Sequence, residues 1–278
     1  MSRLIDVMHL GHDRVIGAYE LDGVIVDPGP STSMQTLLSG LVDEPRALLL
    51  THIHLDHAGA SGSLVKRFPE LRVYVHEAGA PHLVDPAKLL KSATRLYGHD
   101  MERLWGEVLP VPAENIVALE GGESIGGFRV AYTPGHASHH VAYLHEATGD
   151  AYVGDVAGVR IPPFDFTIAP TPPPDIDVEA WERSLDIVAG WDPARLCLTH
   201  FGHAEEPASQ LEHIRERLGW MAELARDGDR EHFMTGVDAR IDELAEPEVA
   251  ARLRQAAPLD QQWLGLERYW RKRAERAA

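Results

Sequence analysis

The segment THIHLDHAG, residues 51–59, concentrates three histidines and one aspartate directly behind an apolar run. Such a run predicts a buried strand. Alternate side chains of extended backbone share one side, so His52 and His54 project together, and the following turn can bring Asp56 and His57 to a neighbouring position. Imidazole nitrogens and carboxylate oxygens are ligands that suit Zn²⁺ or Fe²⁺. This segment therefore predicts a metal site at the end of a strand.

Three further residues of the same kinds stand behind apolar runs elsewhere in the chain. His136 follows FRVAY and a tight Pro-Gly turn, Asp155 ends the run AYVGD, and His200 follows LCLT. Taken singly, Asp155 is equally well explained as a turn or capping residue, and His200 as a surface histidine. Their repeated place at the ends of apolar runs favours one site shared with the first cluster.

The elements that must position these residues are short strands that alternate with helices. Asp22-Gly23 lies between two apolar runs and predicts a hairpin turn within an N-terminal meander. The spacing predicts strands at 46–50 and 72–76 with helices around them, and a second series of strands from about residue 116. The stretch 160–177 is rich in proline and aromatic residues, so we expect a stiff surface loop there.

Composition narrows the classes of partner. The formal net charge is −17 and the chain has no long basic stripe, so its field would repel nucleic acids and anionic membrane surfaces. Charged residues interrupt the first apolar stretch, so we do not expect it to form the apolar core of a signal peptide. No later stretch reaches the roughly 18 to 20 apolar residues that a membrane span needs. Because Cys197 is the single cysteine, an internal disulfide is impossible, and we expect a reducing, cytoplasmic location.

Five motifs, in order, resemble those of the metallo-β-lactamase fold superfamily. They are VIVDPGP, THIHLDHAG, TPGHASHH, VGDVAG and LTHFGH, and the resemblance spans residues 15 to about 203. It implies an αββα sandwich, in which two mixed sheets pack face to face with helices outside and a metal cleft along one edge. Residues 1–203 are then expected to be the catalytic domain, and 204–278, with apolar residues at helical spacing, a C-terminal helical extension packed on it.

The resemblance also implies roles for individual side chains. It makes the ligands of one metal ion His52, His54 and His136, and those of the other Asp56, His57 and His200. Asp155 would bridge the two ions. Asp27, in VDPG, would orient the site without binding metal. His140 is not part of this ligand set, but it follows the turn at His136, and we expect it to orient a ligand or the substrate.

The chemistry implied is metal-assisted hydrolysis of an ester, thioester or lactone of a small molecule. Two divalent cations bring four positive charges, and Asp56 and Asp155 bring two negative ones, which leaves room for a bridging hydroxide. Such a centre lowers the pKa of bound water from 15.7 toward about 7. Asp56 would take up the proton after attack. We expect Zn²⁺, with iron or manganese as alternatives that the same ligands admit.

Other readings of the same motifs stay open. A persulfide dioxygenase-like redox enzyme would use a single iron held by the first cluster, His136 and Asp155. A phosphodiesterase is a further alternative, although the net charge argues against a nuclease. An antibiotic-degrading β-lactamase is disfavoured. Many such enzymes carry a cysteine ligand at the position of Asp155, whereas the single cysteine of this chain, Cys197, stands on a different strand.

The walls of the substrate pocket are the least determined part of the site. Candidates are Tyr97 and Trp105 in the helical stretch 85–110, and a loop group that consists of Arg160, Phe164 and Phe166. Ordinary packing is the competing explanation for each aromatic. TPGHASHH is similar to the corresponding turn of the glyoxalase II group, which hydrolyses glutathione thioesters, but the basic and tyrosine residues of that group's C-terminal helices are not evident in 204–278. These helices are alternatively interpreted as an interface of a homodimer.

Overall fold

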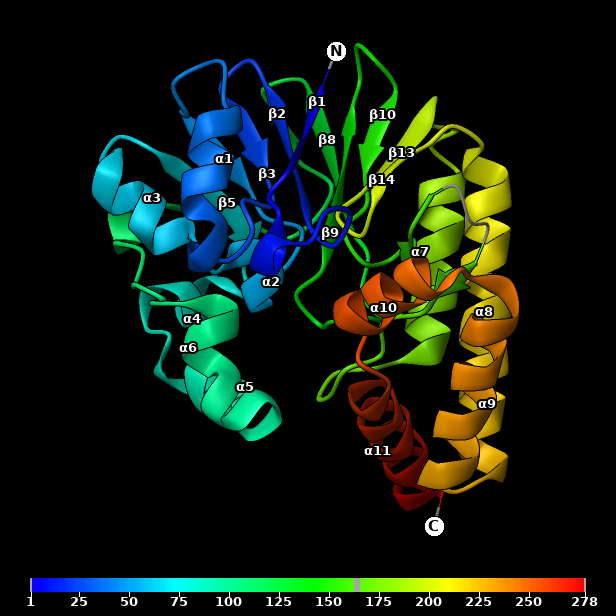
Figure 1. The fold of residues 1–278 in the computed structure, drawn as a ribbon. Coiled ribbons are helices and arrows are strands. Elements are labelled where there is room, and N and C mark those ends of the chain that lie inside the picture. Colours follow the sequence, from blue (N-terminus) through cyan, green and yellow to red (C-terminus); the bar gives the residue numbers. More distant parts are fainter. Residues whose placement is uncertain (1, 163–165, 278) are drawn as a thin grey trace.

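Two six-stranded sheets form the centre of the molecule, as a computed structural model that describes residues 2–162 and 166–277 shows (Figure 1). The first sheet has the order β1 (Arg3–Asp6), β2 (Gly17–Leu21), β3 (Val24–Val26), β4 (Ala47–Leu49), β5 (Arg72–His76) and β6 (Ile116–Leu119). The second has the order β14 (Gly202–Ala204), β13 (Arg195–Leu198), β10 (Asp150–Tyr152), β9 (Val141–His145), β8 (Phe128–Tyr132) and β7 (Ser124–Ile125). A small antiparallel pair, β11 (Val159–Arg160) and β12 (Thr167–Ile168), lies beside them.

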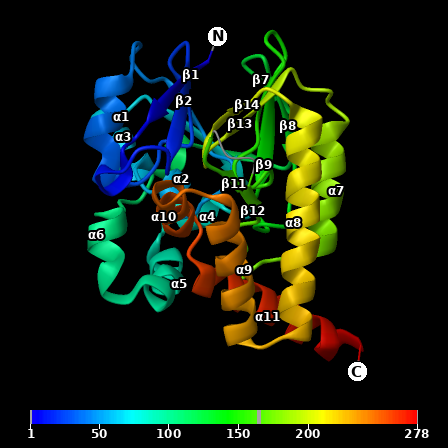
Figure 2. The ribbon, with the colours of Figure 1, turned by 45° about the vertical axis from the view of Figure 1, so that its right-hand side comes forward.

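Helices cover the outer faces of both sheets (Figures 1 and 2). Those on the side of the first sheet are α1 (Met34–Gly40), α2 (Leu55–Ala58), α3 (Ser61–Arg67), α4 (Ala80–Val84), α5 (Ala87–Tyr97) and α6 (Met101–Trp105). On the other side lie α7 (Val178–Ala189), α8 (Pro207–Asp227) and α9 (Arg230–Leu244), while α10 (Pro247–Ala256) and α11 (Leu259–Ala277) lie below the sheets in the view of Figure 1. The four-layer αββα sandwich expected from the sequence is confirmed. No helix in the described ranges is long and apolar enough to cross a membrane.

The N-terminal meander forms as expected. β2 and β3 pair antiparallel with Leu21 opposite Val24, so Asp22 and Gly23 are the two turn residues. Both have positive φ, 49° at Asp22 and 75° at Gly23. A two-residue turn with positive φ at both positions matches the twist of the flanking strands, which explains the Asp-Gly sequence.

The inner faces of the two sheets meet in an apolar layer that includes Leu49, Tyr143 and Cys197. Cys197 is a buried core residue, as the sequence indicated. Tyr19 links the sheets directly, because its hydroxyl donates to the carbonyl oxygen of Leu198 at 2.9 Å. This buried layer fixes the two sheets against each other, and so fixes the loops at their edges.

Strand direction decides which loops meet. β3, β4 and β5 are parallel neighbours in the first sheet, and β10 and β13 are parallel in the second. β8 runs in the same direction as β10, because both pair antiparallel with β9. The carboxyl ends of β3 and β4 therefore lie at one edge of the first sheet, and those of β8, β10 and β13 lie at one edge of the second.

Two local expectations were wrong. β6 pairs parallel with β5 and completes the first sheet, whereas a second series of strands was expected to begin there. The stretch 160–177 is not simply a surface loop, since the segment 166–169 is buried and contains β12. Its apolar residues gain more by packing under α8 than by facing water.

Candidate metal centre

Three imidazole rings from two loops converge on one point. His52 and His54 follow β4, and His136 follows β8. Nδ1 of His54 lies 2.9 Å from Nε2 of His52 and 3.0 Å from Nε2 of His136. Burial is the main cause that lowers the pKa of His54 to about 4, and the neighbouring His136 is the second cause. The ring is therefore neutral at physiological pH. One proton cannot satisfy three facing nitrogens, whereas a cation between them can use a lone pair of each.

A second group of ligand atoms lies beside the first. Asp56 and His57 belong to the short helix α2, and His200 follows β13. Oδ2 of Asp56 lies 3.3 Å from Nε2 of His200 and 3.8 Å from Nε2 of His57. The three ligand atoms are close enough to hold one ion, as are those of the first group.

Asp155 joins the two groups. Its Oδ1 lies 3.1 Å from Nε2 of His57, and its Oδ2 lies 3.3 Å from Nε2 of His136. The residue stands just after β10 and is buried. One carboxylate thus reaches a histidine of each group with a different oxygen.

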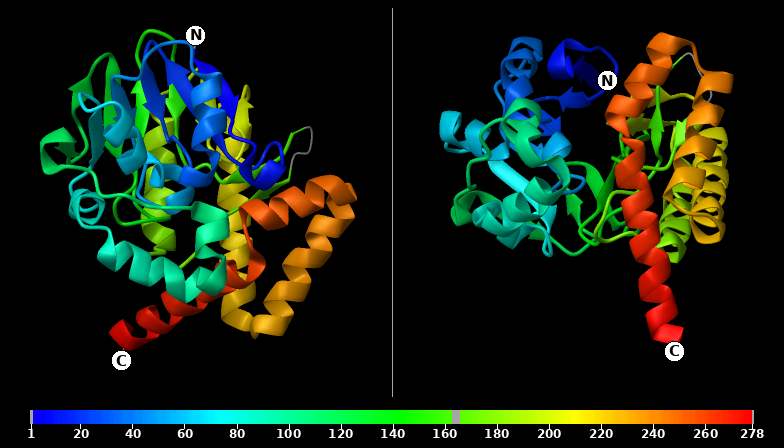
Figure 3. Two further views of the ribbon diagram at one scale, coloured as in Figure 1. Left: turned by 60° about the vertical axis from the view of Figure 1, so that its left-hand side comes forward. Right: turned by 60° about the horizontal axis from the view of Figure 1, so that its bottom comes forward.

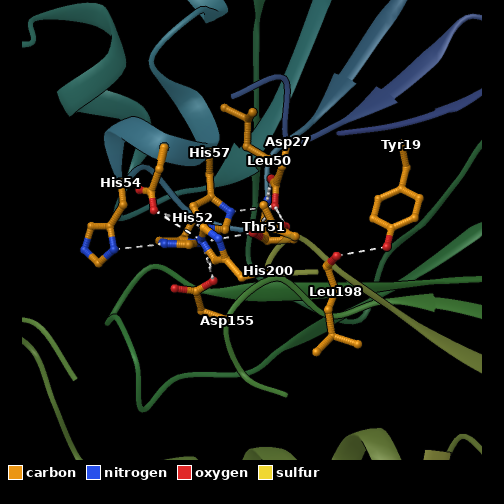
Figure 4. Close-up of polar contacts among 12 residues, drawn as sticks. Tyr19, Asp27, Leu50, Thr51, His52, His54, His57, Asp155, Leu198 and His200 are labelled. Carbon is orange, nitrogen blue, oxygen red and sulfur yellow. Dashed lines mark hydrogen bonds and ion pairs between the residues drawn. The ribbon is translucent and has the colours of Figure 1, made fainter. Parts of the chain in front are cut away.

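The centre is held by a hydrogen-bond network on Asp27, which follows β3 (Figure 4). Oδ1 of Asp27 accepts from the backbone N–H of Thr51 at 2.8 Å. Oδ2 accepts from the hydroxyls of Thr51 at 2.7 Å and Thr199 at 2.9 Å, and from Nδ1 of His57 at 2.8 Å. Since His57 donates through Nδ1, its Nε2 is left as a lone pair that faces Asp155.

His136 and His200 are oriented in the same way by backbone carbonyls. Nδ1 of His136 donates to the carbonyl oxygen of Pro170 at 2.7 Å, and Nδ1 of His200 donates to that of Val15 at 2.6 Å. Among the described side chains, the buried Nε2 of His57, Nε2 of His200 and Oδ1 of Asp155 have no hydrogen-bond partner. Buried polar atoms without partners that face one another fit the donor set of a pair of divalent ions.

Without metal, protons take the place of the ions. Burial by itself lowers the pKa of His57, but the carboxylates of Asp155, Asp27 and Asp56 outweigh it and raise the pKa well above its usual value. The pKa of His200 is also raised, because Asp155 and Asp56 outweigh burial. The pKa of Asp155 is held well below its usual value, because His57 and the other histidines outweigh burial. Metal binding must therefore release protons.

A cavity of about 760 Å³ opens directly over this centre. Asp56, Asp155 and His200 form part of its floor, and α5 and α6 form one wall. Tyr97 and Trp105, both expected from the sequence, line that wall. Their rings meet edge to face, with centroids 5.0 Å apart.

Two other substrate candidates lie elsewhere, which corrects the expectation for them. Neither Arg160 nor Phe166 is among the described residues that line the cavity. Phe166 is buried in the core beneath α8, with the guanidinium of Arg217 5.1 Å from its ring centroid. Arg160 contributes through its backbone, whose N–H donates to the carbonyl oxygen of His200 at 2.6 Å. Phe164 lies outside the described residues.

His140 lies beside His52, and its role as an orienting residue stays a prediction. Its Nδ1 lies 2.8 Å from the hydroxyl oxygen of Thr133, and its ring is stacked beside that of His52 with centroids 5.2 Å apart. Its buried Nε2 has no hydrogen-bond partner. Gly154 makes room for this ring, because a Cβ there would lie 2.8 Å from Nε2 of His140.

Sequence reasoning missed several residues of the site. Thr51 and Thr199 each precede a histidine at a strand end, and this repeated Thr-His pair was a usable signal. His9 stacks on Trp105 with ring centroids 5.5 Å apart and lines the cavity. Gln262, at the start of α11, also lines it. These last positions carried no local signal, because long-range packing brings them to the cavity.

Comparison with known proteins places this geometry in a family. A family model described as "Metallo-beta-lactamase superfamily" matches residues 15–200. The chain is 29% identical over 203 residues to "Metallo-beta-lactamase fold-containing protein ST1585" of Sulfurisphaera tokodaii, covering 70% of this chain and 74% of that protein. It is 30% identical over 144 residues to a hydroxyacylglutathione hydrolase of Thermosynechococcus vestitus, covering 52% of this chain and 46% of that protein. The match thus spans less than half the length of that hydrolase.

Solved structures share the fold. The crystal structure of ST1585 from Sulfolobus tokodaii superposes with a TM-score of 0.73 at 23% identity, covering 95% of this chain and 97% of that one. TTHA1623 in a di-iron-bound form superposes with a TM-score of 0.53 at 29% identity, covering 68% of this chain and 89% of that one. The agreement with ST1585 extends over the C-terminal helices as well as the sheets.

Proposed function

The chain belongs to the metallo-beta-lactamase superfamily, and from that premise we propose that it hydrolyses an ester, thioester or lactone of a small molecule at a pair of divalent metal ions. The resemblance seen in the sequence, and with it the prediction of a metallo-β-lactamase-fold hydrolase, is confirmed at the level of the family. Family membership alone does not say which bond is cleaved.

One observation carries the proposal: two groups of buried ligand atoms meet at a shared carboxylate on the floor of a cavity. In the proposed centre one ion would be held by His52, His54 and His136, the other by Asp56, His57 and His200, and Asp155 would serve both. The second group supports a dinuclear centre over the single-iron alternative, because a mononuclear site would leave the converging lone pairs of Asp56, His57 and His200 without a bound ion.

The residues around the centre divide the work of hydrolysis. Bound divalent ions supply the chemistry of polarising a carbonyl and activating a water molecule at neutral pH. Asp155 and Asp56 offset the positive charge of the ions. The side chain of Asp56 is 21% exposed, and it lines the cavity floor, so it is placed to take a proton from the nucleophile and pass it to the leaving group. Asp27 keeps His57 in the tautomer that presents Nε2 to the centre.

Zinc is the metal we propose for this site. Five histidines and two carboxylates suit Zn²⁺, and they also suit iron and manganese. The di-iron form of TTHA1623 makes iron the first alternative to test. The native metal is therefore to be read from the protein as purified, before any reconstitution.

The charges of the cavity favour a substrate that is uncharged around its scissile bond. Lys88 and Arg103 are the only lysine and arginine side chains among the described lining residues, and Arg103 is paired with Asp100 at 2.9 Å. Asp175 and Asp260 add two more carboxylates to the lining. A strongly anionic carrier such as glutathione would find few cations here, so we propose a neutral ester, thioester or lactone.

The test combines metal quantification with a panel of matched substrates. The protein as purified is expected to contain about two metal ions per chain, and to hydrolyse a neutral ester or thioester faster than the glutathione thioester of the same acyl group. Asp56→Asn is expected to lower kcat by roughly 100-fold or more, because a positioned proton acceptor contributes that much. The surface variant Asp43→Asn is the matched control, with unchanged kcat.

Three results would contradict the proposal. Oxygen consumption by a protein with one iron would establish the redox alternative. Cleavage restricted to phosphodiesters would establish the phosphodiesterase alternative. Full activity in Asp56→Asn would show that Asp56 is not the proton acceptor.

A further inference from the structure

We propose that Gln262, in the first turn of the C-terminal helix α11, is a positioning residue for the metal centre, acting on His136 through Thr171 and Pro170. The inference rests on the proposed function, because it takes His136 to be a metal ligand. It assigns α11, which lies outside the segment matched by the family model, a role at the centre.

Gln262 and Thr171 are locked together in the interior. Both are buried, with exposed fractions of 2% and 0%. The side-chain Oε1 of Gln262 accepts from the backbone N–H of Thr171, and also from the hydroxyl of Thr171 at 3.2 Å. That hydroxyl lies 3.1 Å from the backbone carbonyl oxygen of Gln262 as well. The far end of the amide donates to the carbonyl oxygen of Pro258 at 3.2 Å, so both ends of the side chain are fixed.

Gly265 allows α11 to lie this close to the backbone of Thr171. A Cβ at Gly265, one turn after Gln262, would lie 1.9 Å from the carbonyl oxygen of Thr171. A contact shorter than 3.0 Å with backbone cannot be relieved by turning a side chain, so α11 would have to move away. Gly265 therefore permits the approach on which the hydrogen bonds of Gln262 depend.

The next step leads into the metal centre. Thr171 directly follows Pro170, whose carbonyl oxygen accepts from Nδ1 of His136 at 2.7 Å. Proline has no N–H with which to be anchored, so the peptide that carries this carbonyl is held from its other side, by the N–H of Thr171 on Gln262. Fixing this carbonyl fixes the tautomer and the ring orientation of His136, whose Nε2 faces His54 and Asp155.

A purely structural role would have a different signature. Loss of a buried hydrogen bond lowers the unfolding free energy of the metal-free protein whether or not the bond serves the centre. Positioning of a ligand partner also weakens metal binding itself, typically by 10- to 100-fold. The two roles are therefore separated by measuring metal affinity and stability on the same variants.

The experiment uses the full chain and compares Gln262→Met with Gln261→Met. The two glutamines are adjacent, and both are buried and line the cavity, but of these two described side chains only that of Gln262 forms hydrogen bonds with Thr171. The dissociation constants of Zn²⁺ are measured by competition with a chromogenic chelator, and the stability of the metal-free protein by chemical denaturation. Gln262→Met is expected to weaken one of the two ions about 10-fold or more, whereas Gln261→Met stays within about 2-fold.

Two further variants keep the inference testable if Gln262→Met does not fold. Gln262→Glu retains the oxygen that accepts from Thr171, and is expected to hold zinc more tightly than the methionine variant. Gly265→Ala leaves Gln262 intact but moves α11, and is expected to weaken the same ion. Unchanged zinc affinity in Gln262→Met or Gly265→Ala, with wild type binding two ions, overturns this inference alone. A wild-type chain that binds no ion overturns the proposed function and this inference with it.

Discussion

Replacing Asp27 by Asn is the sharpest test of how the centre is oriented. The backbone N–H of Thr51 cannot turn away, so the amide oxygen of the variant must keep the place of Oδ1. The NH₂ group then replaces Oδ2 and faces two hydroxyls, of Thr51 and Thr199, and Nδ1 of His57. Hydroxyls can rotate to accept. An imidazole that accepts at Nδ1 must carry its proton on Nε2, the atom that faces Asp155.

The magnitude follows from this change of tautomer. A proton on Nε2 of His57 would remove one ligand of the proposed second ion, and the lost charge of Asp27 would make the ring a weaker electron-pair donor to that ion. Changes in such supporting hydrogen bonds typically cost 10- to 100-fold in metal affinity, about 1.4 to 2.7 kcal/mol. The ion held by His52, His54 and His136 is expected to keep its affinity to within a few fold.

The assay is a zinc titration against a chelator, read together with the ¹⁵N shifts of the histidine rings, which report the tautomer. The matched control is Asp150→Asn, a buried aspartate that pairs with Arg195 at 2.6 Å on the strand β10. The control is expected to lose stability and keep both zinc affinities. If the Asp27 variant binds two ions as tightly as wild type, with His57 in its original tautomer, the reasoning about orientation is refuted.

Two other predictions concern pH and packing. Because the pKa values of His57 and His200 are raised, their stabilisation of the metal-free fold is complete below the unfolded value of about 6.5 and is lost as the pH rises through the folded values. Denaturation of chelator-treated protein should show falling stability above about pH 6.5, while zinc affinity rises over the same range; a flat profile for both would contradict the prediction. Gly154→Ala should lower the unfolding free energy by roughly 1–3 kcal/mol in urea denaturation, because a Cβ at φ 47° would meet Oγ1 of Thr51 at 2.4 Å and Nε2 of His140 at 2.8 Å. Wild-type stability in that variant would show that the loop simply shifts.

The sequence predicted the parts of the molecule that short-range patterns determine. The Asp22-Gly23 turn follows from the φ values that such a turn needs. His52 and His54 stand on one loop, so their approach could be read from spacing. Asp155 and His200 come together with them because parallel strands end at a common edge, which the pattern of apolar runs already indicated.

Beyond Tyr97 and Trp105, the walls of the cavity could not be predicted in this way. Phe166 looks like a pocket residue in the sequence, but β11 and β12 pair and turn it under α8, where burial of its ring is worth more. His9 and Gln262 line the same cavity from opposite ends of the chain. No period or motif joins residues so far apart, because their approach depends on how α10 and α11 run back below the sheets (Figure 3).

The hydrogen bond between Thr199 and Asp27 has a consequence for the order in which the site forms during biosynthesis. It ties a loop of the first sheet to a loop of the second, and the histidines on either side of it belong to different halves of the chain. A growing chain on the ribosome carries His52, His54 and His57 long before His200 has been made. Since domains generally fold as units, the complete site can form only after the second sheet has docked. Metal loading should therefore be a late event, and the ions available to the finished chain, not to the nascent one, decide which metal it acquires.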